Sequence, residues 1–231
     1  GMVEWYSTKG MRVLGVTHKY MPSGKTEFTA EDEGDQIFCG YVVFTDPVKE
    51  SAKDAIRDMA EYGIDVKVLT GDNEYVTRHV CDQIGIDVHE VLTGDVISAM
   101  TEDELKEKVE EIHVFTSLTP DNKAAVVKAL KANGHTVGLM GDGINDVLAM
   151  RNADVSISVD TGTDIAKETA SMILLEKDLN VLKAGAIEGR KVYVNSIKYV
   201  KMIGSINFGY MFSLILGSLL FNFEPMGAIM I

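Results

Sequence analysis

The stretch Gly141–Asp146, Gly-Asp-Gly-Ile-Asn-Asp, follows a short apolar run at 136–140 and precedes a predicted helix over 147–151. Two carboxylates and an amide therefore lie where a strand ends and a helix begins. The glycines allow the backbone to turn tightly and to approach a ligand closely. At the carboxyl end of a parallel strand, this combination suits a divalent cation bound beside a phosphate. A polar turn with two solvated aspartates is the alternative interpretation.

Around this loop the sequence alternates between strand-like and helix-like patterns. Strands are predicted at 11–17, 36–45, 66–69, 114–118, 136–140, 155–159 and 172–175, and helices at 48–62, 73–84, 101–110, 119–133 and 147–151. Because the connections are short, the alternation predicts an α/β fold with a parallel sheet covered by helices on both faces.

Polar residues also follow two other predicted strands. Thr70-Gly71-Asp72 offers a hydroxyl and backbone amides at a helix start, which are good donors to phosphate oxygens. Lys123 lies in the first turn of the helix capped by Thr119, where the helix dipole disfavours a cation. A lysine there is better explained if it points at a phosphate. With the Gly141–Asp146 loop, these residues predict a site for Mg²⁺ and a phosphoryl group.

The composition narrows the class of protein. The 231 residues are 46% hydrophobic and 25% charged, which is typical of a globular chain. The net charge of -13 argues against binding nucleic acid through its phosphate backbone. Cys39 and Cys81 are far apart and have no metal-ligand spacing, so we expect buried or incidental thiols in a reducing compartment.

The C-terminal part has the composition of a membrane helix. Residues 202–223 contain no charged side chain, with Lys201 just before them and Glu224 just after. The helical pattern of 181–201 leads into this span without a breaker, which predicts one continuous stalk and membrane helix. A buried core helix is the alternative. Asn207 needs a partner inside an apolar span, and a hydrogen bond to a neighbouring helix would supply one.

Taken in order, Thr70-Gly71-Asp72, Thr119-Pro120-x-x-Lys123 and Gly141–Asp146 resemble the phosphorylation domain of P-type cation-transporting ATPases, which belong to the haloacid-dehalogenase superfamily. Thr45-Asp46-Pro47 resembles the hinge at the return from the nucleotide domain of that family. Gly10–Leu14 resembles the last strand of the nucleotide domain, and its Arg12 would contact ATP phosphates.

Within the family, the magnesium-transporting ATPases are the most similar. The segments that carry this likeness are Leu174–Lys177, Glu188–Arg190, Lys198–Met202 and Ser205–Gly209. Calcium pumps usually have an acidic residue just after the last of these, where this chain has Tyr210 and Met211. A calcium pump remains an alternative.

The resemblance implies a Rossmann-like sheet of haloacid-dehalogenase type with a C-terminal transmembrane helix. It divides the chain into the tail of a nucleotide-binding domain (1–35), a phosphorylation domain (36–180), a stalk helix (181–201), and a transmembrane helix with the start of the next (202–231). Residues 1–201 would be cytoplasmic and the remainder would lie in the plasma membrane.

The resemblance also assigns roles at the site. Thr70 would bind the phosphoryl group, with Gly71 beside it, and Asp72 would act near the nucleotide. Lys123 would neutralise phosphoryl charge and Asn145 would hold a phosphoryl oxygen.

The metal ligands follow from the same resemblance. Asp142 would ligate Mg²⁺, and Asp146 would support the metal site. Mg²⁺ and ATP are the cofactors implied. The partners implied are ATP, a transported divalent cation, the membrane and the remainder of the same ATPase, with no nucleic acid. Asn207 would be a candidate for the path of the transported ion, with a hydrogen bond between helices as the alternative.

The implied activity is an ATP-driven pump that forms and hydrolyses an aspartyl-phosphate, and the likeness to magnesium-transporting ATPases implies Mg²⁺ as the transported ion. The Asp-Lys-Thr-Gly-Thr motif of the phosphorylated aspartate does not occur in this sequence. We therefore expect a C-terminal fragment of such an ATPase, which does not autophosphorylate alone. The rivals are a stand-alone phosphatase with Asp46 as nucleophile, and a non-enzymatic membrane-anchored module that binds Mg²⁺ or nucleotide.

Overall fold

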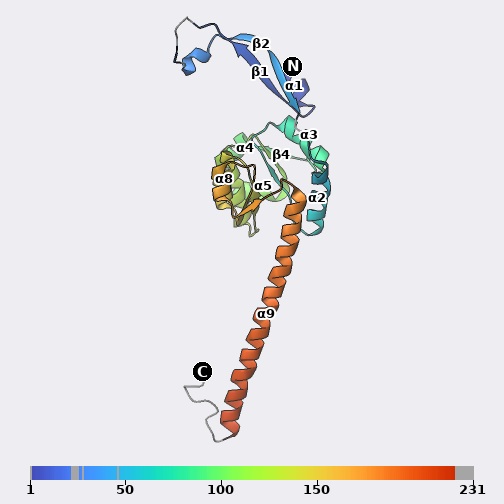
Figure 1. The fold of residues 1–231 in the computed structure, drawn as a ribbon, viewed down its shortest axis with the longest axis vertical. Helices are drawn as coiled ribbons and strands as arrows, with labels where there is room; N and C mark the ends of the chain where they lie inside the picture. The colour runs from blue at the N-terminus through green and yellow to red at the C-terminus, as the bar shows by residue number, and fades with distance from the viewer. Residues whose placement is uncertain (1, 22–25, 28, 46, 222–231) are drawn as a thin grey trace. The chain divides into compact units, whose positions relative to one another are not determined.

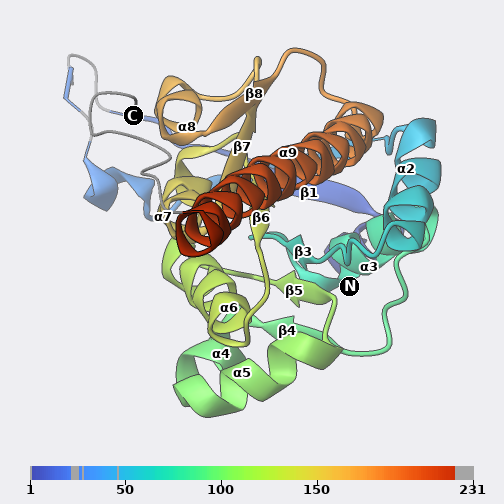
Figure 2. The ribbon, with the colours of Figure 1, turned by 90° about the horizontal axis from the view of Figure 1, so that it is seen from below.

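A computed structural model describes residues 2–21, 26–27, 29–45 and 47–221 of the chain. It divides into two compact units, Gly1–Val181 and Leu182–Ile231. Figure 1 labels several of the elements along the chain, and Figure 2 labels others. The four-part domain division expected from the sequence is finer than these two units and stays a prediction.

The first unit has the predicted alternation of strands and helices. Its strands are β1 (Met11–His18), β2 (Ile37–Thr45), β3 (Val68–Leu69), β4 (Val91–Thr93), β5 (Val114–Thr116), β6 (Gly138–Met140), β7 (Val155–Val159) and β8 (Met172–Leu174). Its helices are α1 (Met2–Ser7), α2 (Glu50–Glu61), α3 (Glu74–Ile84), α4 (Gly94–Ala99), α5 (Glu102–Glu111), α6 (Pro120–Ala132), α7 (Val147–Asn152) and α8 (Asp164–Thr169), with 3-10 turns η1 (Ala30–Glu33) and η2 (Ile144–Asp146).

The α/β fold with parallel strands is confirmed. Strands β3, β5 and β4 form one parallel sheet in the order β3-β5-β4, and β6, β7 and β8 form another in the order β6-β7-β8. Figure 2 shows the members of each sheet side by side. Short strands account for the division into two sheets, because each ladder holds only two or three residue pairs.

Strands β1 and β2 do not follow the parallel arrangement. They pair antiparallel, from Met11 opposite Thr45 to His18 opposite Ile37, with an irregularity in the register between Val16 and Thr17. The sequence predicted both strands, but it placed 36–45 in the phosphorylation domain and not in a hairpin with β1. The alternating strand pattern could not reveal this pairing, because it carries no information about partner or direction.

Helices cover both faces of β5, which is buried throughout. Successive side chains of a strand point to opposite faces. Val114 packs with Cys81 of α3 and Ile86, whereas Phe115 packs with Val109 of α5 and with side chains of α6. All five of these residues except Ile86 are fully buried, and Ile86 is 7% exposed.

Helix α6 connects the two parallel sheets. Its Ala124 and Val127 are buried in one cluster with Ala149 of α7, and Leu69 of β3 and Leu139 of β6 pack against that cluster. The apolar face of α6 thus fixes the end of β3 relative to the end of β6. The polar loops that follow these strands are positioned by the same packing.

The two cysteines differ in environment. Cys81 is fully buried, and desolvation raises the pKa of its thiol to about 11, so the thiol is protonated and inert at neutral pH. Cys39 is exposed.

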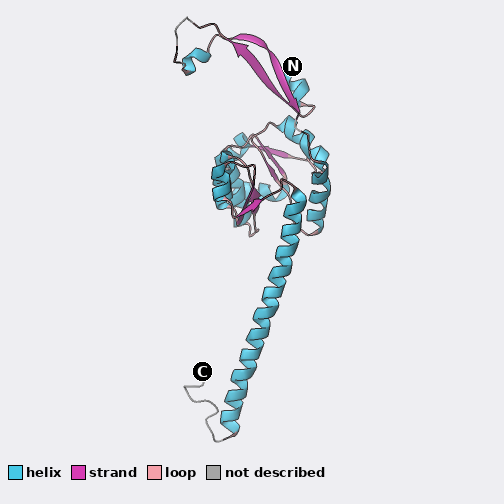
Figure 3. Ribbon diagram, in the orientation of Figure 1, coloured by secondary structure: helices cyan, strands magenta, loops and turns pink. Residues whose placement is uncertain are grey.

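Helix α9 (Leu179–Leu220) begins at the end of the first unit and forms nearly all of the described part of the second, and it runs for 42 residues without a break (Figure 3). By length and composition it is able to cross a membrane, with a mean hydropathy of 1.5 over its most apolar window. The predicted start of a next helix, after residue 221, lies outside the described residues. Asn207 is exposed on α9, so both interpretations of this residue stay open.

Candidate active site

The loops after β3 and β5 are held together by backbone hydrogen bonds. The amide of Leu118 donates to the carbonyl of Thr70 at 3.0 Å, and the amide of Ser117 donates to the carbonyl of Asp72 at 2.8 Å. Ser117 adopts a left-handed backbone conformation, with φ of 53°, to make this connection. The Thr70–Asp72 turn therefore lies directly against the segment that leads into α6.

The Thr70–Asp72 turn is closed by its own side chains. The amide of Asp72 donates to Thr70 Oγ1 at 3.1 Å, and this hydroxyl donates to Asp72 Oδ2 at 3.2 Å. The Arg12 guanidinium pairs with Asp72 Oδ1. This pair borders a hollow of about 220 Å³, whose lining includes Gly10, Pro47 and Val76. The two residues predicted to act near the nucleotide, Arg12 and Asp72, are thus brought together.

Lys123 reaches across to the neighbouring loop. Thr119 caps α6 by accepting from the amide of Asn122, and Pro120 occupies the first helical position, as predicted. Lys123 Nζ lies 2.6 Å from Asp146 Oδ1, and the two side chains are only 11% and 18% exposed. The cation in this first turn is therefore balanced by a carboxylate outside its own helix. The sequence predicted that Lys123 points away from its helix, but it did not predict this partner.

The Gly141–Asp146 loop folds closely around Asp146. A Cβ atom on Gly141 would lie 2.5 Å from Asp146 Cβ, so no larger residue fits at position 141 without a shift. The amide of Gly143 donates to Asp146 Oδ2 at 3.4 Å. Asn145 is exposed on the same turn, η2. The close packing of Asp146 against Gly141 therefore places its carboxylate within reach of Lys123.

Asp142 is the exposed carboxylate of the loop. Its backbone carbonyl accepts from the amide of Thr163 at 2.9 Å, and its Oδ2 lies 2.8 Å from Lys177 Nζ. The hydrogen bond from Lys177, reinforced by the charges of Lys177 and Lys123, holds the pKa of Asp142 below its ordinary value of 3.8. Asp142 is therefore ionised at neutral pH and, at 53% side-chain exposure, open to solvent.

The donor set fits Mg²⁺ bound together with a phosphate. No group of three or more His, Cys, Asp or Glu side chains suited to a metal occurs among the described residues. Mg²⁺ does not need such a group, since it commonly takes one or two carboxylates and completes its shell with phosphate oxygens and water. Asp142 would supply an open, ionised carboxylate, and Asp146 lies four residues away in the same loop.

The predicted site residues are connected through one series of contacts. It runs from Arg12 through Asp72 and Thr70 to the start of α6, and from Lys123 to the Gly141–Asp146 loop. Asn207 belongs to the second unit, and Asp46, the nucleophile of the phosphatase alternative, lies outside the described residues.

Sequence reasoning missed Lys177 as a site residue. It was noted only as part of the resemblance to magnesium-transporting ATPases. It follows the predicted strand 172–175 at the same sheet edge as Asp142, so the rule that located Thr70 and Asp142 applies to it as well.

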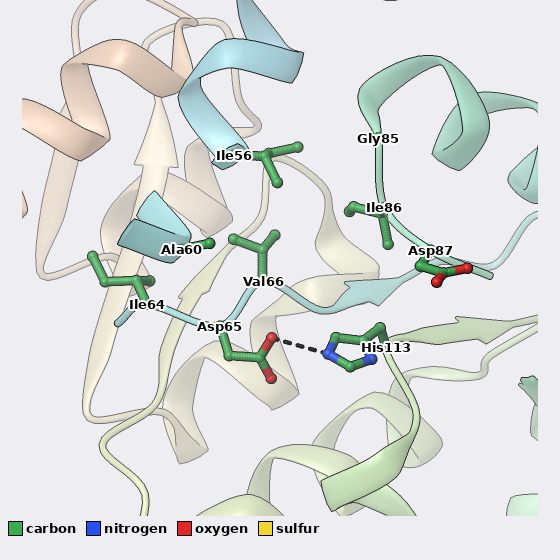
Figure 4. Close-up of a pocket in the computed structure, with 9 residues that line it drawn as sticks. All are labelled: Ile56, Ala60, Ile64, Asp65, Val66, Gly85, Ile86, Asp87 and His113. Carbon is green, nitrogen blue, oxygen red and sulfur yellow. Dashed lines mark ion pairs between the residues drawn. The ribbon is translucent and has the colours of Figure 1, made fainter. Parts of the chain in front are cut away.

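A second hollow, of about 180 Å³, lies at the opposite ends of the strands. Figure 4 shows its lining, in which Val66 precedes β3 and His113 precedes β5, with Ile56 and Ile86 above them. Asp65 Oδ1 lies 3.1 Å from His113 Nε2. The lining contains none of the predicted site residues.

Comparison with known proteins decides the family. Residues 12–154, more than half of the chain, match the family described as haloacid dehalogenase-like hydrolase. The chain belongs to this family.

This haloacid dehalogenase-like chain is similar to curated proteins named "Magnesium-transporting ATPase, P-type 1". It is 49% identical over 228 residues to the protein of Salmonella typhimurium strain LT2, and 46% identical over 225 residues to that of Escherichia coli K12. These alignments cover 98% and 97% of the chain but only 25% of each relative, so the chain spans about a quarter of their length. The resemblance drawn from the motifs is confirmed.

The chain also has more distant matches. The chain is 34% identical over 214 residues to "Calcium-transporting ATPase 1" of Lactococcus lactis, with 92% of the chain and 24% of that relative covered. A solved structure of the catalytic domain of the CPx-ATPase CopB-B covers 65% of this chain and 49% of its own, at 25% identity. Its TM-score of 0.47 is too low to add to the fold assignment.

Replacing Lys123 by Met should lower the free energy of unfolding by about 3 kcal/mol, because Asp146 would keep a largely buried charge without its partner. Lys131→Met is the matched control: the Lys131–Asp154 pair has a similar distance, 2.9 Å, but both side chains are 36% exposed. Lys131→Met should lower the free energy of unfolding by less than about 1 kcal/mol. Chemical denaturation followed by circular dichroism measures the free energy of unfolding of both variants. Equal losses of stability would show that burial does not make the Lys123–Asp146 pair more important than the Lys131–Asp154 pair.

The ion pair of Asp142 predicts a pH dependence. Because the pKa of Asp142 is lowered in the folded chain, the stabilisation from this carboxylate is present above its unfolded pKa and is lost as the pH falls through the folded value. Lys177→Met should raise the pKa of Asp142 towards 3.8. An NMR titration of the Asp142 carboxyl carbon measures this, and an unchanged pKa in the variant would show that Lys177 is not the cause.

Proposed function

We propose that this chain is part of a P-type ATPase that transports Mg²⁺ and passes through an aspartyl-phosphate whose aspartate lies in another part of the ATPase. The observation that carries the proposal is the connection between the Thr70–Asp72 turn, Lys123 and the Gly141–Asp146 loop, which follow the carboxyl ends of β3, β5 and β6. The identities of 49% and 46% to magnesium-transporting ATPases over nearly the whole chain support it.

The site is suited to phosphoryl transfer by positioning and charge, which supply most of the catalysis in this reaction class. Thr70 offers a hydroxyl, and Gly71 leaves its backbone accessible, at a place where a phosphoryl group would approach. Lys123 would neutralise charge on that group from a position fixed by Asp146. Asn145 would hold a phosphoryl oxygen from the exposed side of η2.

Nucleotide recognition would fall to Arg12 and Asp72. Their ion pair borders the hollow of about 220 Å³, where a triphosphate would compete with Asp72 for the guanidinium. ATP would then bind between the hairpin β1–β2 and the edge that carries Thr70.

The cofactor would be held by Asp142, with Asp146 in support. When bound, Mg²⁺ would neutralise charge that develops on the phosphoryl oxygens. The chain would keep Asp142 ionised and accessible. The glycines of the loop let the backbone of Asp142 lie close to the end of β6.

Transport would involve α9. Its length and composition fit a membrane span, with Asn207 on the path of the transported divalent cation, and residues 1–201 would lie on the cytoplasmic side of the plasma membrane. The remainder of the same ATPase would supply the other helices and the phosphorylated aspartate. A calcium pump is the less favoured cargo assignment, since the calcium-transporting relative is 34% identical.

The proposal predicts that the chain alone, incubated with γ-labelled ATP and Mg²⁺, forms no acid-stable phosphoprotein. In a chimera in which it replaces the matching quarter of the E. coli relative, labelling should be retained. Asp142→Asn should reduce the labelling rate in the chimera by about a hundredfold or more, the usual loss when a group that stabilises transition-state charge is removed. The chimera with Asp103→Asn, the same change at a side chain of α5 that is 91% exposed, is the control.

Two results would contradict the proposal. Labelling of the isolated chain would place the phosphorylated residue within it. Hydrolysis of a phosphate ester by the isolated chain, abolished by Asp46→Asn, would favour the stand-alone phosphatase.

A further inference from the structure

Lys177 is at the carboxyl end of β8, with its ammonium group on the carboxylate that the proposed function assigns to Mg²⁺. We propose that Lys177 is a resident counter-cation of Asp142: it holds this carboxylate when no metal is bound and competes with the divalent cation for it. The inference rests on the proposed function, and it assigns to Lys177 a role in setting the metal affinity of that site.

The two ion pairs of the Gly141–Asp146 loop have opposite environments. Lys123 and Asp146 are 11% and 18% exposed, so water hardly reaches their contact, and separating them would leave a buried charge. Lys177 and Asp142 are 59% and 53% exposed, although their distance of 2.8 Å is similar. An exposed ion pair contributes little to the folding free energy, and ions from the solvent readily replace either partner. The first pair is therefore structural, and the second is displaceable.

The backbone around Lys177 is anchored independently of this ion pair. Lys49 donates from its ammonium to the carbonyl of Lys177. Asp178 accepts from Ser51 Oγ at 3.3 Å and from the amide of Asn180 at 2.8 Å. When a cation displaces the ammonium of Lys177, these contacts keep the backbone of Lys177 in place, so its side chain stays within reach of Asp142. Lys177 thus stays available to return, which is the condition for competition.

Ammonium and Mg²⁺ exclude each other at one carboxylate for electrostatic reasons. Lys177 hydrogen-bonds Oδ2 of Asp142, and the charge of Lys123 already acts on the same carboxylate. A dication bound to Asp142 would be repelled by an ammonium held within hydrogen-bond distance of the same group. The metal must therefore displace Lys177, and its apparent affinity is lower than Asp142 would give without this lysine.

Mn²⁺ binding to the full 231-residue chain in detergent tests the inference, with free Mn²⁺ measured by electron paramagnetic resonance. Lys177→Met should lower the dissociation constant about two- to fivefold, the equivalent of losing one exposed ion pair. Lys177→Arg keeps the charge and should leave the constant unchanged. Lys131→Met makes the same charge change at an exposed pair with Asp154 and should also leave it unchanged.

The outcomes separate this inference from the proposed function. Asp142→Asn should abolish the binding in the wild-type and Lys177→Met backgrounds. If binding depends on Asp142 but is unchanged or weaker in Lys177→Met, the competition is rejected and the metal role of Asp142 stands. If no variant shows binding that depends on Asp142, the metal role and the competition are both rejected.

Discussion

The ion pair between Lys123 and Asp146 is the contact on which the candidate site depends. It joins the first turn of α6 to the Gly141–Asp146 loop, and so connects the edge of the β3-β5-β4 sheet to the edge of the β6-β7-β8 sheet. A salt bridge this well buried requires good geometry, because both charges have lost most of their water. The apolar packing of α6 against Leu69 and Leu139 supplies that geometry.

Two carboxylates four residues apart take different tasks because their surroundings differ. Asp146 is enclosed by the close approach of Gly141 and paired with a buried lysine. Asp142 projects into solvent, with its pKa lowered by Lys177. Asp146 joins the loop to α6, whereas Asp142 remains accessible. Ligands commonly bind at the carboxyl ends of parallel strands, and a binding site needs rigid support for its accessible groups.

Much of the fold and of the site could be predicted from local sequence signals. Thr119 and Pro120 fixed the start of α6, and the apolar run before Gly141 fixed β6. Pairing partners could not be predicted in this way, so β2 was not assigned to a hairpin with β1. Strand β4 and helix α4 were not predicted, because the segment Val91–Ala99 is too short to show a clear periodic pattern of apolar residues. The Lys123–Asp146 contact depends on packing between helix and sheets, which no local pattern encodes.

We propose that the loops after β3, β5 and β6 form one Mg²⁺ and phosphoryl site. The most direct test is a Mg²⁺ titration of the ¹⁵N-labelled chain with chemical shifts mapped by residue. The account predicts changes concentrated at 141–146, extending to 117–123 and 70–72, and none around Asp65 and His113 at the opposite strand ends (Figure 4). Changes confined to that opposite edge, or spread over the acidic surface without preference for Asp142, would contradict it.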